Sequence, residues 1–566
     1  MISPEAWSCV VSAYVPGVPS LPAGQPPAPT PDVQWDGPWS CSGLLLDRSS
    51  GLLLCHGEIF FPFLRQREQE LSRKPFLLPG AFPPDLQIRV QFPGARGRSQ
   101  PNPTLASACN PAAPRTQAPN VDSSPNCSPA QMLMVFPCPE FQDIFQTLFR
   151  ESDKWCFYGE DKERELQSEL LDLVWFGLLR CPGWAANGDG DDALGAGTLQ
   201  YVRSECLRKG QPMFSCASPF ASLCSEIFMN TFSKGIVSNL AGERNAMILT
   251  DARCLPGTEG GGVYIRSRGM YYLAGLIVAP LCWKANEWVG LTLVCSATCI
   301  FETVGRILNG FGHRGKNMSF CPVQVSGHLP LTNPGRHGLT RLLGAVALLE
   351  CGRVWGSGVI VSPRLILTCR HVLDRASDVR VKIPSDSHRF LALRGRVLFA
   401  TKENSAYDVA VVELEEDLLA VETPAIASGF STGEDVWVVG YGVFGQSCGP
   451  SVTAGILSAV ITVGNQPVML QTTCAVHAGA SGGPVFRSSS RELLGIVSSN
   501  ARNNSAGATY PHLNFSLPIT VLQPLLGAYS RTRDAAAFEG LNEPSDRLRA
   551  LWRLQGSLSA AQKSKL

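Results

Sequence analysis

The chain has 566 residues, of which 45% are hydrophobic and 17% are charged, and its formal net charge is +1. This length predicts about two to four domains, each able to bury a sizeable core. Because no polybasic block accompanies the near-neutral charge, we expect neither a nucleic-acid partner nor an anionic membrane surface. The longest apolar run, residues 270–283, contains Gly275 and Pro280, so we also expect no membrane span.

The 20 cysteines are the second feature of the composition. The first seven residues show no basic region followed by an apolar one, so we expect no secretory signal. We therefore predict mostly buried free thiols in a reducing compartment. No pair of cysteines has a matching second pair or histidine pair at zinc-site spacing, so we expect no metal and no cofactor.

Composition divides the chain into four parts. Residues 1–310 contain a stretch, residues 93–132, that is rich in Pro, Asn, Ser and Ala. Such a stretch cannot bury enough apolar surface to offset its ordering entropy, so we predict a disordered, exposed insert there. Residues 311–340 predict a linker, residues 341–528 an independent domain, and residues 529–566 a helical or flexible tail.

From residue 341 onwards, short apolar runs alternate with glycine turns. Runs such as 358–361, 365–368 and 409–412 have the length of strands and are rich in β-branched residues. Evenly spaced short strands with glycine turns predict an all-β barrel fold.

Three motifs in this region carry side chains suited to nucleophilic catalysis. His371 follows one apolar run, Asp408 precedes another, and Ser481 lies in the sequence Gly-Ala-Ser-Gly-Gly-Pro at 479–484. A serine hydroxyl needs a base near neutral pH, so His371 would take its proton and Asp408 would orient the imidazole. The backbone N–H groups of Gly479 and Ser481 would bind the oxyanion. Each motif is weak alone, but this order with these flanks predicts a catalytic triad.

The two halves of the chain also resemble each other weakly. The alignment places Glu259, Glu58 and Asp172 opposite the serine, histidine and aspartate of the triad. A glutamate pair cannot replace a serine and its imidazole base, so we predict a catalytically inactive, degenerate β domain in the first half. A chance match of short apolar patterns is the alternative. The matching segments, in the same order, are 41–46 with 356–361, 52–55 with 365–368, 234–238 with 454–458, 254–264 with 474–486, and 271–278 with 491–498.

The catalytic motifs resemble those of the trypsin-like serine protease family, and most of all those of its HtrA group. The resemblance covers residues 341–520 and includes Gly-Ser-Gly at 356–358 and Thr-x-x-His at 368–371. It implies a double β-barrel with the active site between the barrels. Ala480 departs from the family, whose secreted members carry there an aspartate that pairs with a new N-terminus, so we do not expect activation of that kind.

The resemblance also implies a substrate pocket. Its floor would lie near Ala475 and one wall near Ser498 and Asn500. No aspartate lies there, so we expect a small or uncharged substrate residue instead of Lys or Arg. His477 would either donate a hydrogen bond to a substrate side chain or face water in a turn, and the sequence leaves both open.

The chain ends in Ser564-Lys565-Leu566, a tripeptide that the peroxisomal import receptor reads. We therefore expect this receptor as a partner and the peroxisomal matrix as the location. Together with the degenerate half, the tripeptide makes the whole chain similar to the peroxisomal processing proteases of this family. That resemblance implies that imported matrix enzymes are the substrates, from which targeting leaders are removed or which are cut internally.

We therefore expect a serine endopeptidase that acts through an acyl-enzyme. Self-cleavage is expected within the insert, with Cys109 and Asn110 as candidates, because an exposed segment of a protease is open to attack. The alternatives are a peptide-binding scaffold and a general quality-control protease of the HtrA type. A cysteine-based redox protein is a further alternative, but no thiol lies in a convincing nucleophile motif. The sequence is compatible with a homo-oligomer.

Overall fold

The structure is a computed structural model that describes most of the chain. The described residues are 3–16, 39–64, 75–93, 127–150, 155–157, 171–182, 199–220, 224–280, 282–284, 287–310, 323–324, 336–352, 354–384, 390–418, 421–445, 447–503, 508–543 and 545–553.

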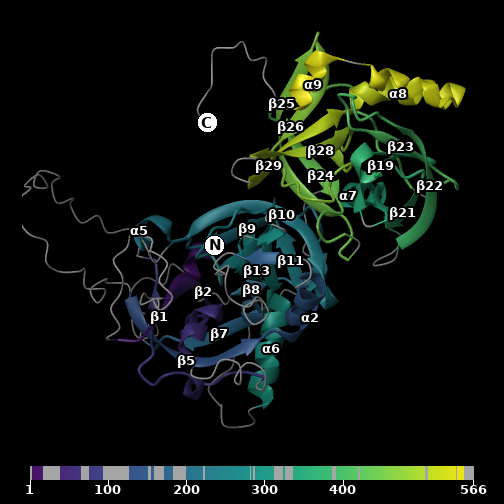
Figure 1. Ribbon diagram of the computed structural model, residues 1–566. Coiled ribbons are helices and arrows are strands. Elements are labelled where there is room, and N and C mark those ends of the chain that lie inside the picture. Colours follow the sequence, from purple (N-terminus) through teal and green to yellow (C-terminus); the bar gives the residue numbers. More distant parts are fainter. Residues whose placement is uncertain are drawn as a thin grey trace, which may run out of the picture.

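The first half of the chain folds into two closed rings of strands (Figure 1). The first ring has the order β1 (Ser8–Tyr14), β2 (Trp39–Asp47), β3 (Leu52–His56), β7 (Trp175–Arg180), β5 (Cys127–Pro137) and β4 (Gln87–Gln91). The second ring closes because β12 pairs with both β9 and β13; its order is β12 (Gly262–Ser267), β9 (Pro212–Ala217), β10 (Thr231–Ala241), β11 (Met247–Thr250), β16 (Thr292–Ser296) and β13 (Met270–Ala279). Short strands extend it or form a separate small sheet: β8 (Gln200–Tyr201), β17 (Val323–Gln324), β6 (Trp155–Phe157), β14 (Cys282–Lys284) and β15 (Glu287–Trp288).

The second half repeats this architecture with two closed barrels. One has the order β18 (Val346–Cys351), β19 (Val354–Ser362), β20 (Leu365–Thr368), β23 (Ala410–Leu414), β22 (Phe390–Ala400) and β21 (Asp378–Pro384). The other has the order β24 (Asp435–Gly440), β25 (Ser451–Val463), β26 (Gln466–Thr472), β29 (Ala508–Pro518), β28 (Leu493–Asn503) and β27 (Pro484–Arg487). The prediction of an all-β double barrel is thereby confirmed.

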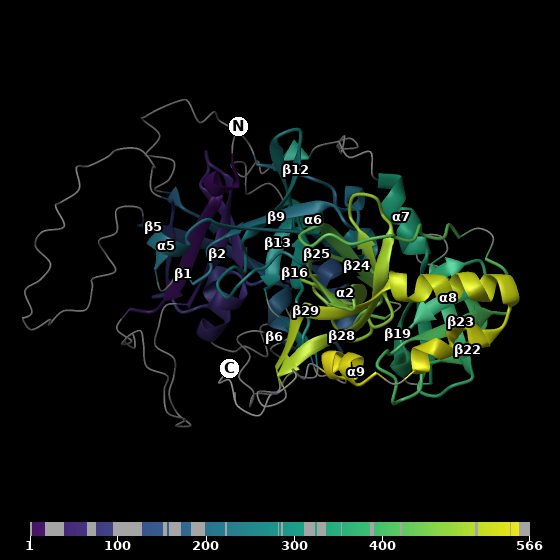
Figure 2. The ribbon, with the colours of Figure 1, turned by 90° about the horizontal axis from the view of Figure 1, so that it is seen from above.

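Helices lie outside these barrels (Figure 2). None of the helices in the described ranges combines the length and apolarity that crossing a membrane requires. They are α2 (Pro139–Leu148), α5 (Ser225–Phe228), α6 (Ala297–Gly310), α7 (Arg336–Gly344), α8 (Ile519–Thr532) and α9 (Asp546–Trp552), with the 3₁₀ turns η1 (Pro4–Ala6), η2 (Glu58–Phe63), η3 (Pro79–Ala81), η6 (Leu171–Val174), η7 (Ser204–Cys206), η8 (Glu243–Asn245), η9 (Arg370–Val372) and η10 (Ala535–Asn542).

Some strands, such as β3 and β20, are buried along their whole length, whereas β21 alternates between core and solvent. In β21, Val379, Val381 and Ile383 are buried, while Asp378 and Arg380 are exposed. This period of two is what a pleated strand with one face on a core requires. The cysteines in the described ranges are free thiols, and most of them are buried.

Local geometry supports a common origin of the two halves. A bulge interrupts β2–β3 between Leu45 and Asp47, and an equivalent one interrupts β19–β20 between Ile360 and Ser362. In the first half, Oγ of Ser42 donates to the carbonyl of Gly257 at 2.8 Å. In the second half, Oγ of Ser357 donates to the carbonyl of Gly479 at the same distance. The degenerate β domain predicted for the first half is therefore present as a second pair of barrels.

The structure corrects one member of the predicted repeat. The β3–β7 ladder pairs Leu52 with Arg180, just as the β20–β23 ladder pairs Leu365 with Glu413. Continuing both registers places Trp175, and not Asp172, at the position of the triad aspartate. The sequence alignment chose Asp172 because it is a carboxylate, like Asp408. The equivalent position is instead set by the register of the strand ladder, in which a shift by one residue moves every side chain to the opposite face.

Three predicted boundaries also shift. Residues 127–132 of the expected insert belong to β5, and residues 94–126 lie outside the described residues. Within the expected linker, β17 pairs with β8. The expected boundary at residue 528 falls inside α8, and the buried residues Phe538 and Leu541 beyond it pack into the core of the second half.

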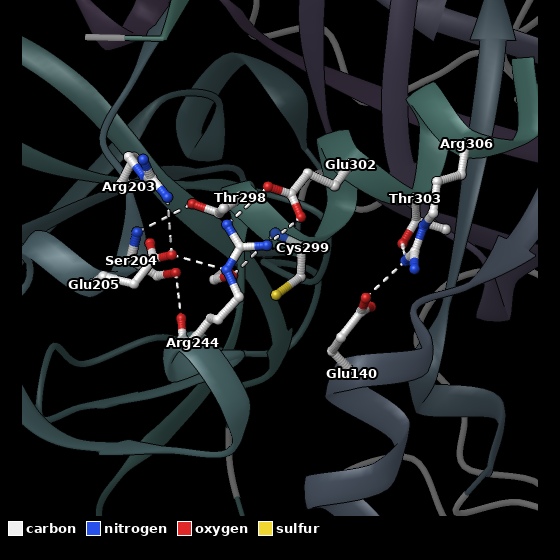
Figure 3. Close-up of polar contacts among 11 residues, drawn as sticks. Glu140, Arg203, Ser204, Glu205, Arg244, Thr298, Cys299, Glu302, Thr303 and Arg306 are labelled. Atoms are coloured by element: carbon white, nitrogen blue, oxygen red, sulfur yellow. Dashed lines mark hydrogen bonds and ion pairs between the residues drawn. The ribbon is translucent and has the colours of Figure 1, made fainter. Parts of the chain in front are cut away.

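Ion pairs surround α6, the helix that follows the last strand of the second barrel. Figure 3 shows Arg244 beside Glu302 and Glu205, with Nη2–Oε1 of Glu302 at 2.8 Å and Nε–Oε1 of Glu205 at 2.8 Å. On the other side of α6, Arg306 donates to Glu140 of α2 at 2.7 Å. α2 lies between strands β5 and β7 of the first barrel, and α6 follows strand β16 of the second, so the Arg306–Glu140 bond joins the two barrels.

The two halves meet along β10 and β25. One carboxylate, that of Asp251, accepts from the N–H of Ile236 at 2.7 Å and from that of Ala454 at 2.6 Å. Burial raises the pKa of Asp251 to about 6, against the opposing effect of these two donors. Asn239 adds a bond from Nδ2 to Oγ of Ser451 at 2.8 Å. The interface therefore contains buried polar groups that pair across it.

Candidate active site

The fold of the second half brings the three predicted catalytic residues into one cleft. β20 ends at Thr368, which pairs with Ala410 of β23, so His371 after one strand lies beside Asp408 before the other. Ser481 lies in the turn before β27, and its carbonyl accepts from the N–H of Ser357 at 2.8 Å. The cleft has a volume of about 500 Å³, and all three side chains line it.

Asp408 bonds to both the imidazole and the backbone of His371. Its Oδ2 is hydrogen-bonded to Nδ1 of His371, and its Oδ1 accepts from the backbone N–H of the same residue at 3.1 Å. Arg370 adds a longer ion pair at 3.7 Å. Burial opposes ionisation of Asp408, but the hydrogen bonds and charge of His371 outweigh it, so the pKa of this carboxyl lies below its ordinary value. The carboxylate is therefore charged and oriented to stabilise an imidazolium.

The turn before Ser481 has the geometry that an oxyanion hole requires. The N–H of Ala480 donates to the carbonyl of His477 at 3.0 Å, and Gly479 has φ +89°. A positive φ at the third residue, with an ordinary φ at the second, defines a type II β-turn, which needs glycine there. In such a turn the N–H of the third residue is not used by the turn itself, so the N–H of Gly479 stays available to a substrate oxygen. We call residues 477–480 the oxyanion turn.

Three of the four predicted pocket residues line the cleft. They are His477, Ser498 and Asn500, and Nδ2 of Asn500 donates to the carbonyl of Val476 at 2.7 Å. Ala475, the fourth, is buried. It lies against Gly290 of the first half, where an added Cβ would be 3.2 Å from the Cβ of Ala475. The expected pocket floor therefore abuts the first half.

His477 is buried and does not face water as a turn histidine would. Its Nδ1 accepts from the N–H of Val443 at 3.2 Å, so the ring proton is on Nε2. Burial lowers the pKa of His477 to about 4, and the charge of Lys284 acts in the same direction. The imidazole is therefore neutral near pH 7.

The cleft also contains residues that the sequence did not point to. Glu287 of β15 reaches it from the first half, Arg549 and Trp552 reach it from the C-terminal helix α9, and Arg553 directly follows that helix. This helix lies within the tail at 529–566 that was predicted to be helical or flexible, and its Trp552 packs edge-on against Tyr407 with ring centroids 6.2 Å apart. Its location beside the active site depends on long-range packing that has no local signal.

In the first half, the described residues at the equivalent positions include no histidine. Glu259 follows Gly257 as Ser481 follows Gly479, and burial raises the pKa of Glu259 to about 7. The imidazole of His56 is buried, and its Nε2 lies 3.1 Å from the carbonyl oxygen of Leu173. The described residues of this half thus give Glu259 no histidine in the position that His371 occupies.

One set of side chains in the described ranges could hold a metal ion. The ligand atoms of Cys369, His371 and Asp408 lie within 4.8 Å of one another. Two of these residues are already hydrogen-bonded to each other, and Sγ of Cys369 donates to the carbonyl of Val497 at 3.1 Å. The absence of a metal and of a cofactor stays a prediction.

The remaining predicted sites fall outside the described residues. These are the self-cleavage candidates Cys109 and Asn110 and the terminal residues Ser564, Lys565 and Leu566.

Comparison with known proteins shows that the chain is similar to serine proteases. A family model described as a trypsin-like peptidase domain matches residues 356–496, which include all three candidate catalytic residues. Peroxisomal leader peptide-processing proteases of Mus musculus and Homo sapiens are each 45% identical to the chain, over 99% and 100% of it and over 98% and 99% of their own lengths. A probable periplasmic serine endoprotease of the DegP-like type from Halomonas elongata is 32% identical over 31% of the chain and 35% of its own length.

Proposed function

Because this chain belongs to the family of peroxisomal leader peptide-processing proteases, and is therefore a peroxisomal serine endopeptidase, we propose that Ser481 is its nucleophile. His371 is the general base and acid, and Asp408 orients it. The observation that supports this assignment is that two hydrogen bonds join His371 to Asp408 and that both residues line the same cleft as Ser481.

The reaction follows from the proposed roles. Oγ of Ser481 attacks the scissile carbonyl while Nε2 of His371 takes its proton. The carbonyl oxygen becomes an oxyanion, which the N–H groups of Gly479 and Ser481 bind, a stabilisation on the order of 10²–10³ in rate per donor. His371 then gives the proton to the leaving amine, which leaves an acyl-enzyme. A water molecule activated by the same imidazole releases the acid.

The finer calls on substrate and location extend this proposal. We propose that the enzyme acts in the peroxisomal matrix, which it reaches through the import receptor and residues 564–566. There it removes targeting leaders or processes imported enzymes internally, and it cuts itself near Cys109. The preferred residue before the cut is small or uncharged, because no carboxylate lies at Ala475. Glu287 and Arg549 in the cleft supply charges that can contact residues further along an extended peptide.

Two experiments test the proposal. A fluorophosphonate probe should label wild-type protein and fail to label Ser481→Ala. Ser499→Ala is the matched control, because Ser499 lines the same cleft and plays no part in the proposed reaction. Labelling of Ser481→Ala at the wild-type rate would refute the nucleophile. Incubation of the enzyme with peroxisomal matrix proteins, followed by sequencing of new N-termini, would identify the substrates; new termini equally abundant with Ser481→Ala would refute the processing role.

A further inference from the structure

A loop of the active half has its side chains in the core of the inactive half. Residues 441–445, which we call the brace loop, are the first part of the connection from β24 to β25. Val443 is 7% exposed and Phe444 is 6% exposed, and both belong to the hydrophobic core built mainly by the first half. The ring of Phe444 stacks on Trp155 with centroids 5.5 Å apart and an interplanar angle of 15°, and it meets Phe149 edge-on at 5.9 Å. The brace loop is therefore fixed by residues of the inactive half.

Lys284 of β14 adds a charged contact at the same place. Its Nζ donates to the carbonyl of Val443 at 3.2 Å. The ammonium also lies 5.2 Å from the ring of Trp155 in the first half and 5.8 Å from the ring of Trp355 in the second. Cation–π attraction at these distances adds to the hydrogen bond. One side chain of the inactive half thus joins both halves and the brace loop.

The backbone of the brace loop in turn holds the oxyanion turn. The N–H of Val443 donates to Nδ1 of His477, the first residue of that turn, at 3.2 Å. The carbonyl of Gly442 accepts from Nε1 of Trp355 at 3.1 Å. A Cβ on Gly479 would lie 2.5 Å from this carbonyl oxygen and 2.8 Å from the same indole nitrogen, so the turn is packed directly against both.

We propose that the inactive half is a built-in positioning element for the oxyanion hole, with Lys284 as its positioning residue. This inference rests on the proposed role of Ser481. A rotation of one peptide unit separates a type II turn from a type I turn, and only the first directs the N–H of Gly479 towards a substrate oxygen. Ala480 offers no carboxylate to anchor the turn, so the anchor is the chain of contacts from Lys284 through Val443 to His477. Contacts that favour one of two conformations raise the fraction of competent enzyme.

Lys284→Met tests the proposal, because it keeps the length of the side chain and removes the charge and the donor. We expect kcat on a peptide substrate to fall roughly tenfold to a hundredfold, while KM changes by less than about threefold. The upper end of this range approaches the loss expected when one oxyanion donor is removed completely. Lys284→Arg keeps the charge and a donor and should recover most of kcat. The rate of fluorophosphonate labelling should follow kcat, because phosphonylation also develops charge in the oxyanion hole.

Lys209→Met is the matched control. Lys209 also crosses the interface and donates to the carbonyls of Cys448 and Pro450, each at 2.8 Å. Both residues lie at the β25 end of the same connection, beyond the brace-loop residues that contact the oxyanion turn. We expect this variant to lower the melting temperature and to leave kcat within about threefold of wild type. An equal loss of kcat in Lys209→Met and Lys284→Met would overturn the proposal, since the effect would then be general loosening of the interface.

A second pair of variants covers the case in which Lys284→Met does not fold. Trp355 is 37% exposed, and Trp355→Phe keeps an aromatic ring but removes the donor to Gly442. Phe444→Leu keeps an apolar side chain in the core but removes the stacked ring. Both should lower kcat roughly tenfold, and a wild-type kcat in both would overturn the proposal. Failure of the wild-type enzyme to label at Ser481 would instead overturn the proposed function.

Discussion

The conformation of the oxyanion turn makes a quantitative prediction for Gly479→Ala. The residue has φ +89°, and an added Cβ would meet the carbonyl oxygen of Gly442 at 2.5 Å and Nε1 of Trp355 at 2.8 Å. A left-handed φ costs a residue with a Cβ about 1–2 kcal/mol, and such close contacts cost more. The turn relieves both by rotating the peptide, which removes one oxyanion donor, a loss of about 2.7–4 kcal/mol in transition-state stabilisation.

The assay for this variant is steady-state hydrolysis of a peptide substrate. We expect kcat to fall on the order of 10²–10³-fold with KM little changed, because the donor acts on charge that develops in the transition state. Gly433→Ala is the matched control, since Gly433 has φ +88° in the same barrel but no atom within 4 Å of the added Cβ. It should cost stability and leave kcat unchanged. A kcat of Gly479→Ala within about threefold of wild type would refute the reasoning.

Three further predictions concern stability, cleavage and specificity. His56 and His477 have pKa values lowered to about 4 by burial, so the folded state binds fewer protons than the unfolded chain, and each should cost up to about 3 kcal/mol of stability as the pH falls from the unfolded value towards 4. Asp251 and Glu259, with raised pKa values, act in the opposite direction over this window, so the test is the difference between two proteins. The melting temperature of the wild type should fall relative to that of His56→Gln, and a difference that is independent of pH would contradict the burial argument. Cleavage in the insert between β4 and β5 should leave the fragments together, because these strands pair on either side of it; separation on a sizing column under native conditions would contradict this. Arg549→Glu should change KM at least about fivefold for peptides with charged residues and leave kcat unaltered, whereas Arg547→Glu on the exposed face of α9 should change neither, and equal effects would remove α9 from substrate recognition.

The residues of the proposed active site could be read from the sequence because their signals are local. Each candidate residue adjoins a strand or turn whose pattern is visible over a few positions, such as the glycines around Ser481 and the apolar run before His371. The strands of the second half were predictable for the same reason, since short apolar runs rich in β-branched residues and bounded by glycine turns are local signals. The β domain of the first half was inferred from the segments that match them.

The errors and omissions have a different origin. Trp175 and not Asp172 occupies the aspartate position of the first half, because a ladder of backbone hydrogen bonds sets the register and similarity of side chains does not. Glu287 and Arg549 reach the cleft from elements far from Ser481 in the chain. Neither position carries a mark that distinguishes it from a solvated charge.

The sequence by itself therefore determined the reactive groups and the barrels that carry them, since these depend on residue type and short-range spacing. Only the tertiary structure decided that the first half packs against the second and contacts its oxyanion turn through Lys284 and Val443. The physical reason is that contacts between distant segments depend on the shape of two folded surfaces, which no stretch of either sequence specifies alone.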